Sequence, residues 1–290
     1  MTSLDHTRNA SVCLEETASP FLKWAGGKAR LIEQFEPYFP KAYGRYFEPF
    51  IGGGALFFRM QPEDAVISDI NERLIDAYTA IRDELPALME RLERHSSKHS
   101  RDYYYRARER FNHGRNMSVV ERASLMIYLN KTCFNGLYRE NRRGDFNVPI
   151  GSYVTPTVFR EENLLAVSRQ LQDTEIRVRS FEHVLQNARE GDFVYFDPPY
   201  VPLSATSSFT SYVGAGFDLQ MQQRLAEVFT ELAHRGCYVF LSNSDSPVVR
   251  ELYRGWRMEN IRAGRAISAK GSGRSSVNEL LVIGKPALRG

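Results

Sequence analysis

Cysteine, long apolar runs and net charge are all scarce in this sequence, and each scarcity argues against a class of protein. The 290 residues contain three cysteines, Cys13, Cys133 and Cys237, and no CxxC pair. This pattern argues against a disulfide framework and a zinc site, and it fits a reducing compartment. No apolar run is long enough to cross a bilayer, and residues 1–20 lack the apolar core of a signal peptide. We therefore expect a cytoplasmic protein with no membrane partner, no bound metal and a flexible N-terminal tail over residues 1–20.

The net charge is only +3, but the charges are unevenly distributed along the chain. Residues 91–143 contain 13 Lys and Arg against 5 Asp and Glu, a local charge of +8. The rest of the chain has 25 against 30, a charge of −5. A basic segment inside an otherwise acidic chain is typical of a protein that binds a polyanion.

Residues 191–200 (GDFVYFDPPY) predict a buried strand that ends at an acidic residue and two prolines. Neither proline can donate to a sheet ladder, so the strand must stop at Asp197. The Asp197 carboxylate, the Pro198 carbonyl and the Tyr200 ring would then share one strand tip. Such a tip can accept hydrogen bonds from a flat amine and stack on its face. On these ten residues alone, an ordinary turn after a strand is an equally good interpretation.

Two segments near the N-terminus indicate a nucleotide site. A strand, the glycine-rich turn at residues 48–54 (EPFIGGG) and a helix over 55–60 form a βα element that presents backbone N–H groups to a ligand. A second strand over 66–69 ends in Asp69, where a ribose hydroxyl pair is usually held. Together they favour an adenosine-containing cofactor over a structural coincidence. In residues 21–28 (FLKWAGGK), two glycines before a lysine would let the backbone approach a ligand. Taken alone, this segment is better interpreted as a simple loop with an exposed lysine.

The basic segment has a different pattern from the rest. Helical periodicity covers residues 72–83, 84–95, 102–111 and 119–131, and residues 132–149 have the Asn-Gly and Arg-Gly-Asp pairs of a loop or β-hairpin. Arg and Asn can bind base edges, and an aromatic ring can insert into a base stack. A solvated, charged hairpin is the alternative. From about residue 160 strands and helices alternate again, and the last two strands are expected to be antiparallel.

The motifs at residues 21–28, 48–54, 69–71 (DIN), 134–149 and 197–200 (DPPY) resemble those of the Dam-type DNA adenine-N6 methyltransferases, the D12 class of the α-group. The likeness covers roughly residues 21–285 and includes PLSAT at 202–206 and RAIS at 265–268. DPPY occurs across amino-group methyltransferases, whereas FLKWAGGK with NGLxRxN…GxFNVPxG is more specific and points to enzymes that recognise GATC.

The resemblance implies an α/β fold with a Rossmann-like methyltransferase sheet, mostly parallel with an antiparallel C-terminal strand. The catalytic domain would comprise residues 21–71 and 160–290. A mainly helical DNA-recognition domain with a β-hairpin would be inserted at residues 72–159. S-adenosyl-L-methionine is the implied cofactor and double-stranded DNA the implied partner, and we expect a monomer. Loops over 201–216 and 264–277 would border the binding surfaces.

The resemblance also implies roles for single residues. Asp197 and Pro198 would accept hydrogen bonds from the target N6 amino group, and Tyr200 would stack on the base. The implied cofactor contacts are Trp24, Lys28, Glu48, Phe50, Gly52, Gly54, Asp69 and Asp197. The implied DNA contacts are Lys23, Phe134, Asn135, Leu137, Arg139, Asn141, Asn147, Pro149 and Tyr153.

The sequence departs from the family pattern at three of these or neighbouring positions. Phe134 replaces the expected tyrosine, so it can still wedge into a duplex but lacks a hydroxyl, and Tyr138 and Glu140 also differ. Cytosine-N4, RNA and protein-glutamine methyltransferases share the chemistry, and a non-catalytic DNA-binding regulator could share the fold. The basic insertion disfavours a protein substrate, and Asp before Pro-Pro favours adenine by resemblance. The joint presence of the glycine turn, Asp69, Asp197 and Tyr200 disfavours an inactive regulator.

Overall fold

The computed structural model describes residues 16–24, 28, 31–200, 217–262 and 279–285. The loops expected over 201–216 and 264–277, the PLSAT and RAIS motifs and most of the expected tail lie outside the described residues. Residues 16–20 are held against the body: Ala18 is buried, and the Ser19 amide donates to Asn163 Oδ1 at 2.9 Å. Within the described part of the chain, no helix has the length and apolar character needed to span a membrane.

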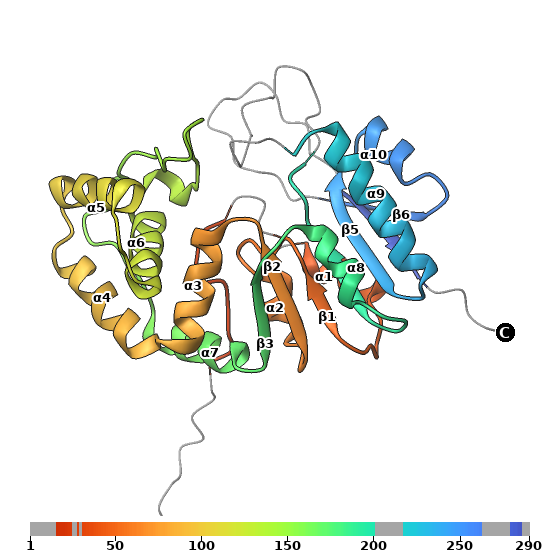
Figure 1. Cartoon of the computed structure of the whole chain (residues 1–290), viewed down its shortest axis with the longest axis horizontal. Coiled ribbons are helices and arrows are strands. Elements are labelled where there is room, and N and C mark those ends of the chain that lie inside the picture. Colours follow the sequence, from red (N-terminus) through yellow and green to blue (C-terminus); the bar gives the residue numbers. More distant parts are fainter. Residues whose placement is uncertain (1–15, 25–27, 29–30, 201–216, 263–278, 286–290) are drawn as a thin grey trace, which may run out of the picture.

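A twisted sheet of seven described strands forms the centre of the molecule, in the order β3-β2-β1-β4-β5-β7-β6 (Figure 1). Neighbouring strands pair in parallel from β3 to β5, whereas β7 lies between β5 and β6 and is antiparallel to both. This confirms the predicted α/β fold and the antiparallel last pair. The strands are β1 Tyr46–Glu48, β2 Ala65–Asp69, β3 Thr174–Val178, β4 Phe193–Phe196, β5 Tyr238–Ser244, β6 Arg257–Ile261 and β7 Glu279–Gly284.

The central strands are buried on both faces, as parallel strands covered by helices must be. In β4, Phe193 and Tyr195 belong to one apolar cluster, and Val194 and Phe196 belong to another on the opposite face. Strand and helix alternate because parallel strands need a crossover. The helices and turns of this part are α1 Ile32–Phe35, η1 Glu36–Tyr38, α2 Ala55–Met60, α7 Glu161–Leu171, η3 Phe181–His183, α8 Val184–Asn187, α9 Leu219–His234 and α10 Pro247–Leu252.

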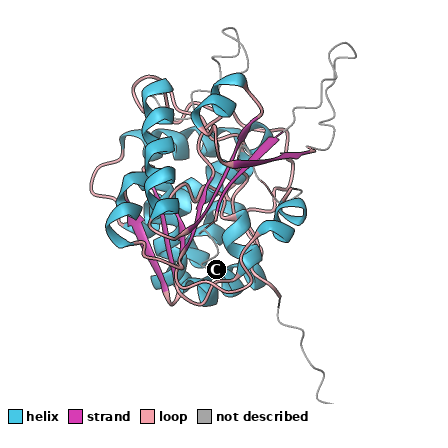
Figure 2. Ribbon diagram, turned by 90° about the vertical axis from the view of Figure 1, so that its right-hand side faces the viewer, coloured by secondary structure: helices cyan, strands magenta, loops and turns pink. Residues whose placement is uncertain are grey.

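Four helices follow β2, and each lies within two residues of its predicted span at both ends: α3 Glu72–Asp83, α4 Leu85–Ser97, α5 Arg101–His113 and α6 Val119–Thr132. The side chains of Asn71, Ser100 and Ser118 cap α3, α5 and α6. In Figure 1, α4, α5 and α6 gather at one end of the sheet, and the turned view of Figure 2 shows helices on both sides of the strands. Helix α3 packs against α6 and against β2 and β3, so it joins the helical bundle to the sheet.

The segment after α6 folds back on itself, as the loop or hairpin prediction requires. It begins with the turn η2 Phe134–Gly136 and is closed by two isolated antiparallel bridges, Cys133 to Ile150 and Glu140 to Phe146. At its tip the Asn141 side-chain oxygen accepts from the amides of Arg143 (2.8 Å) and Asp145 (3.0 Å). We call residues 133–150 the hairpin segment.

Candidate active site

Asp197 stands at the carboxyl end of β4, and two neighbours hold it through the same oxygen. Ser242, on the adjacent strand β5, donates to Asp197 Oδ1 at 3.0 Å, and Lys28 Nζ lies 3.2 Å from this atom. The Ser242 hydroxyl also bonds the buried Tyr195 hydroxyl at 2.9 Å. Burial raises the pKa of Asp197, while Lys28 and Ser242 oppose this rise. Both contacts use Oδ1, so among the described residues Oδ2 is the oxygen left for a ligand.

The Lys28 ammonium is at the centre of this group of side chains. Its residue is only 3% exposed, and Nζ lies 3.4 Å from Glu279 Oε2 in addition to its contact with Asp197. Nζ is also 4.2 Å from the centroid of the Tyr200 ring and donates to the Tyr200 hydroxyl. Burial raises the pKa of Glu279, and the Lys28 charge opposes this. The buried Lys28 ammonium therefore contacts the carboxyl groups of Asp197 and Glu279 and the Tyr200 ring.

Sequence reasoning missed Glu279 and Ser242. Glu279 opens β7 directly opposite Ser244 of β5, which brings it to the same sheet edge as Asp197. An acid at the start of an otherwise apolar strand (ELLVIG) was the only sequence signal for Glu279, and no motif contains Ser242.

The glycine turn and Asp69 form a second cluster. Asp69 Oδ2 accepts from the Gly52 amide at 3.4 Å, and Oδ1 accepts from the Asn71 amide at 3.0 Å. Burial raises the pKa of Asp69 to about 6, although these backbone bonds oppose the rise. Gly52 and Gly54 have φ of +47° and +69°, and a Cβ on Gly54 would lie 2.7 Å from the Tyr78 hydroxyl. The turn therefore requires glycine for both conformation and space.

Glu48 links the two clusters. It is 3% exposed at the end of β1, and its Oε2 accepts from the Tyr46 hydroxyl at 2.7 Å. Burial raises the pKa of Glu48 to about 8, and the negative charge of Asp197 adds to the rise. The tip of β4 and the glycine turn are thus close enough for their charges to interact. Phe50, within the turn, instead stacks on Phe181 at 5.5 Å between ring centroids.

Trp24 and Lys23 connect the glycine turn to the hairpin segment. A Cβ on Gly52 would lie 2.7 Å from Trp24 Cδ1, and the Trp24 ring stacks on Tyr138 at 5.1 Å between centroids. The Lys23 amide donates to Asn130 Oδ1 and the Lys23 carbonyl accepts from Asn130 Nδ2, both at 2.8 Å. Asn130 Nδ2 also donates to the Gly136 carbonyl at 3.2 Å. Helical periodicity predicted the helix that contains Asn130, but only the structure shows that its side chain joins Lys23 to Gly136.

The residues expected to contact DNA are mostly on the surface. Seven of the nine are exposed, which an interface requires: Lys23, Phe134, Asn135, Leu137, Arg139, Pro149 and Tyr153. Half of the Phe134 side chain is open to solvent, which is unusual for a ring of this size. Asn141 and Asn147 are half-buried, since Asn141 caps the hairpin tip and Asn147 Oδ1 accepts from Arg139 Nε at 2.7 Å.

The two remaining departures from the family pattern, Tyr138 and Glu140, are partners. The Tyr138 hydroxyl donates to Glu140 Oε1, and Arg73 of α3 lies 3.4 Å from this oxygen. Arg73 also donates to the Gly144 carbonyl at 3.2 Å. The two substitutions therefore form a contact that fastens the hairpin segment to α3.

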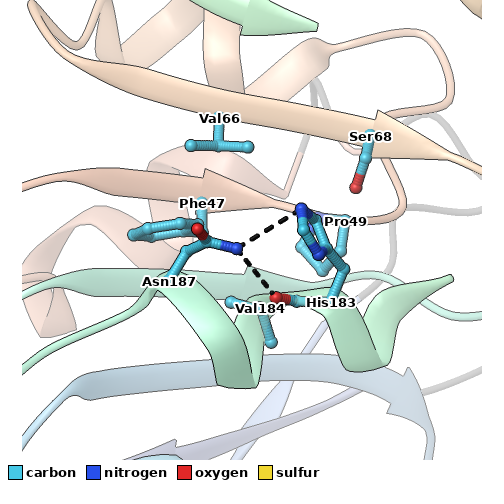
Figure 3. A pocket seen from close by; sticks show the side chains of 7 residues that line it. All are labelled: Phe47, Pro49, Val66, Ser68, His183, Val184 and Asn187. Carbon is cyan, nitrogen blue, oxygen red and sulfur yellow. Dashed lines mark hydrogen bonds between the residues drawn. The ribbon is translucent and has the colours of Figure 1, made fainter. Parts of the chain in front are cut away.

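A small pocket on the opposite face of the sheet is not part of this site. Figure 3 shows it between β1, β2 and the η3–α8 turn, with Asn187 Nδ2 donating to the His183 carbonyl at 3.1 Å. Its walls are mostly apolar, and it contains none of the predicted site residues: it is lined by Phe47, Pro49, Val66, Ser68, His183, Val184 and Asn187.

Comparison with known proteins identifies the family of the chain. The family described as D12 class N6 adenine-specific DNA methyltransferase matches residues 24–267. The chain is 44% identical over 267 residues to the type II methyltransferase M1.LlaDCHI of Lactococcus lactis subsp. cremoris, with 91% of this chain and 94% of that protein covered. It is 36% identical over 271 residues to the DNA adenine methylase of Escherichia coli K12, with 92% and 96% covered. The chain therefore belongs to the D12 class of N6 adenine-specific DNA methyltransferases.

Proposed function

We propose that this chain transfers a methyl group from S-adenosyl-L-methionine to N6 of an adenine flipped out of double-stranded DNA, within GATC, and that one copy of the chain suffices. The observation that carries the proposal is the meeting of two clusters at one sheet edge. Asp197 presents Oδ2 there, and the Asp197 charge reaches Glu48 at the base of the glycine turn. An amine bound by the first cluster would thus be beside a donor bound by the second.

The glycine turn suits an adenosine that carries a positive charge. Asp69 would accept hydrogen bonds from ribose hydroxyls, as acids at the end of the second strand commonly do. Lys28 pairs with the carboxyl groups of both Asp197 and Glu279, and Glu48 places a third carboxyl group nearby, so a cationic ligand would favour the ionised forms of these groups. When bound, S-adenosyl-L-methionine supplies an electrophilic methyl group. The residues proposed to hold it are Trp24, Lys28, Glu48, Phe50, Gly52, Gly54, Asp69 and Asp197.

Asp197 and the Pro198 carbonyl would accept the two N–H bonds of adenine N6 while Tyr200 stacks on the base. The N6 lone pair is normally delocalised into the ring, and this pair of acceptors favours a tetrahedral nitrogen whose lone pair is free to form a bond to the methyl carbon. The bond from that carbon to sulfur would break at the same time, its electron pair would stay on the sulfur as a neutral thioether, and N6 would lose one proton to solvent. An ionised Asp197 is required, because a protonated carboxyl would donate from one of its oxygens. Lys28 and Ser242 stabilise the ionised form against burial. Positioning and electrostatics would supply most of the rate acceleration.

The target amine is inaccessible in a stacked duplex, so the base must be flipped out at a cost of about a few kcal/mol. The exposed ring of Phe134 would fill the space that the base leaves. We propose that Lys23, Leu137, Arg139, Pro149 and Tyr153 contact bases, with Asn135 beside them, and that Asn141 and Asn147 contact phosphates. The bundle and hairpin segment, residues 72–159, would thus form the recognition domain. GATC rests on the motif resemblance described above.

The catalytic role of Asp197 can be tested with Asp197→Asn, which keeps the shape of the side chain but removes its charge. We expect methyl transfer from labelled S-adenosyl-L-methionine to fall by at least about 100-fold, the scale of losing one preorganised electrostatic contact. Binding to duplex DNA should be unchanged. Asp64→Asn is a matched control, because Asp64 is exposed and pairs with Arg45 instead. Near-normal turnover in Asp197→Asn would refute this role.

The target base and sequence can be established by base-resolved mapping of methyl marks on DNA from cells that express the chain. We expect N6-methyladenine confined to GATC. Marks on cytosine N4 would overturn the adenine assignment, marks at other adenines would overturn GATC alone, and absence of methylation by the purified protein would favour a non-catalytic regulator.

A further inference from the structure

Gln222 is a polar side chain on the buried face of α9. Asp218 caps this helix, because its side chain accepts from the Met221 amide, and Gln222 therefore stands in the first turn. Leu225 and Phe229 follow on the same face, where α9 packs against β5 (Figure 1). Gln222 is only 1% exposed. A buried amide is costly unless it is hydrogen-bonded, so this position calls for specific partners.

Both ends of the Gln222 amide have partners. Its Nε2 donates to the Pro199 carbonyl at 3.0 Å, and its Oε1 accepts from Asn243 Nδ2 at 3.3 Å. Asn243 Oδ1 in turn accepts from the Ser244 amide at 2.8 Å. A backbone N–H can only donate and a backbone carbonyl can only accept, so the two ends of this series fix the orientation of both side-chain amides. Gln222 therefore presents its N–H group, not its oxygen, to Pro199.

The carbonyl that Gln222 binds belongs to the turn at residues 197–200 (DPPY). Two successive prolines contribute no backbone N–H, so this turn has to be held through its carbonyls and side chains. The ring of Pro199 fixes φ, which leaves ψ as the free torsion between that ring and Tyr200. Since ψ sets the direction of the Pro199 carbonyl, a hydrogen bond to that carbonyl restrains ψ. The same peptide plane contains the Tyr200 amide, so the bond also restrains the residue proposed to stack on the base.

Two neighbouring residues of β5 hold this turn from opposite faces of the sheet. Side chains alternate along a strand, so Ser242 and Asn243 point to opposite faces. On one face Ser242 donates to Asp197 Oδ1 at 3.0 Å. On the other face Asn243 orients Gln222, which donates to the Pro199 carbonyl. The residues on either side of Pro198 are thus each held by a side chain.

We propose that Gln222 is a positioning residue for methyl transfer, and that Asn243 orients it. Gln222 holds the Pro199 carbonyl, so that the Pro198 carbonyl and the Tyr200 ring meet the target adenine in one orientation. The inference rests on the proposed function, because it takes a base bound at residues 197–200 as the substrate. The proposed DNA contacts are on other elements, so loss of Gln222 should lower kcat without weakening DNA binding. A misplacement of about 1 Å can cost on the order of 100-fold in rate.

The first experiment tests the contact by NMR on the full chain, with carbon-13 at the proline carbonyls and nitrogen-15 at the tyrosine amides. The sequence contains two Pro-Tyr pairs, at 37–38 and 199–200, so a spectrum that correlates each amide with the preceding carbonyl has two signals, and the first is an internal reference. Gln222→Met keeps the length of the side chain but removes its N–H donor. We expect this variant to shift the Pro199 signal. Gln223→Met, at the adjacent exposed position of α9, should leave the signal in place. An unshifted Pro199 signal in Gln222→Met overturns the proposal.

The second experiment measures steady-state methylation of a GATC duplex. We expect kcat to fall about 10-fold or more in Gln222→Met, with an unchanged Kd for DNA by fluorescence anisotropy, while Gln223→Met matches wild type. Asn243→Ala should lower kcat less. The double variant should be no slower than Gln222→Met, because the two residues act in series. A shifted Pro199 signal with normal kcat overturns the positioning role, and losses that multiply in the double variant overturn the role of Asn243.

The two readouts separate this inference from the proposed function. Circular dichroism checks folding, and if Gln222→Met does not fold, Asn243→Ala provides both readouts. The NMR signal does not require methyl transfer, so in an inactive wild type the proposed function would fail while the Pro199 signal would still decide whether Gln222 holds the turn. A wild type that methylates adenine, together with an equally active and folded Gln222→Met, would refute this inference alone.

Discussion

Two carboxyl groups share one buried ammonium at the edge of the sheet, and a third carboxyl group lies near them. Lys28 lies within 3.4 Å of Asp197 and Glu279, and Glu48 is close enough to feel the charge of Asp197. The pKa of each of the three carboxyl groups is raised, in each case chiefly by burial. At the scale of single residues, burial therefore disfavours the ionised forms of these carboxyl groups, and a bound cation would favour them.

Glu48 should make the protein less stable at alkaline pH. Its pKa rises from 4.5 to about 8 on folding, so the folded state binds its proton more tightly than the unfolded chain does. The stabilisation is complete below pH 4.5 and is lost as pH rises through about 8. Glu48→Gln should therefore raise the free energy of unfolding above that of wild type by ~1–3 kcal/mol at pH 9, with a smaller difference at pH 5.

Urea denaturation at the two pH values measures this effect. Glu63→Gln, at an exposed position before β2, serves as the control and should show no pH-dependent difference. A Glu48→Gln variant whose difference from wild type is the same at both pH values would contradict a raised pKa at Glu48.

Glu279 should act as a positioning residue for Asp197. In Glu279→Gln, Lys28 would pair with Asp197 alone and draw electron density from the oxygens that accept the target amine. We expect kcat to fall about 10-fold, equivalent to about 1.4 kcal/mol, with an unchanged Kd for DNA. Because a negative neighbour is removed, the pKa of Asp197 should drop and the acid limb of the kcat profile should move to lower pH.

A purely structural role for Glu279 would not move that limb. The matched control is Glu259→Gln on the neighbouring strand β6, where Glu259 bonds Arg257 instead. If the two variants have the same pH profile as wild type, Glu279 does not tune Asp197.

At the scale of elements, the conformation of the hairpin segment depends on close packing between Lys23 and Gly136. Buried and exposed side chains alternate at Leu137, Tyr138 and Arg139, so the buried Tyr138 fixes the direction of its two exposed neighbours. Gly136, just before them, has φ of +64°, and a Cβ there would clash with Lys23 Cδ and lie 2.6 Å from Lys23 Cβ. The exposed Phe134 is part of the same turn.

Gly136→Ala should therefore cost more than backbone strain alone. Gly144 also has positive φ (+80°), but nothing lies within 4 Å of a Cβ there, so Gly144→Ala isolates the cost of φ. We expect Gly136→Ala to lose ~1–3 kcal/mol of stability and to bind GATC duplex more weakly, with a smaller stability loss in Gly144→Ala. Urea denaturation and anisotropy measure the two effects. Equal losses of stability would mean that the Lys23 contact contributes nothing.

At the scale of the whole molecule, the basic bundle and the acidic sheet edge meet at one place. The bundle lies at one end of the sheet (Figure 1), and the contacts of Trp24 with Tyr138 and of Arg73 with Glu140 join it to the site. DNA held by the bundle and a cofactor held at the glycine turn would thus converge. A cofactor in the proposed site would bridge elements that are far apart in sequence, so its binding should stabilise the whole fold.

Thermal denaturation with S-adenosyl-L-methionine tests this expectation. At a concentration 100 times its Kd the ligand should add ~2.7 kcal/mol, which corresponds to a rise in Tm of roughly 4–5 °C for a chain of this size. Gly52→Ala should abolish the shift, because a Cβ there would lie 2.7 Å from Trp24 Cδ1. A wild-type Tm that does not respond to the ligand would contradict the proposed cofactor site.

Local features of the sequence were sufficient to predict most of the architecture. The four helices of the insertion were predicted from periodicity, and the Asp197 strand from two prolines that cannot continue a ladder. The glycine turn, Asp69 and Asp197 were each predicted to follow the carboxyl end of a strand. These features are determined by neighbours in the chain, so they can be read without knowledge of the fold.

The sequence by itself determined the elements, the strand that ends at Asp197 and the family to which the motifs point. Only the tertiary structure decided which side chains face Asp197: Lys28 and Glu279 are separated by most of the chain and meet because β7 inserts beside β5. Burial and charge proximity set the pKa values of Glu48, Asp69 and Lys131, and neither has a local sequence signal. The physical reason is that desolvation and Coulomb interactions depend on distance in space rather than on separation along the chain.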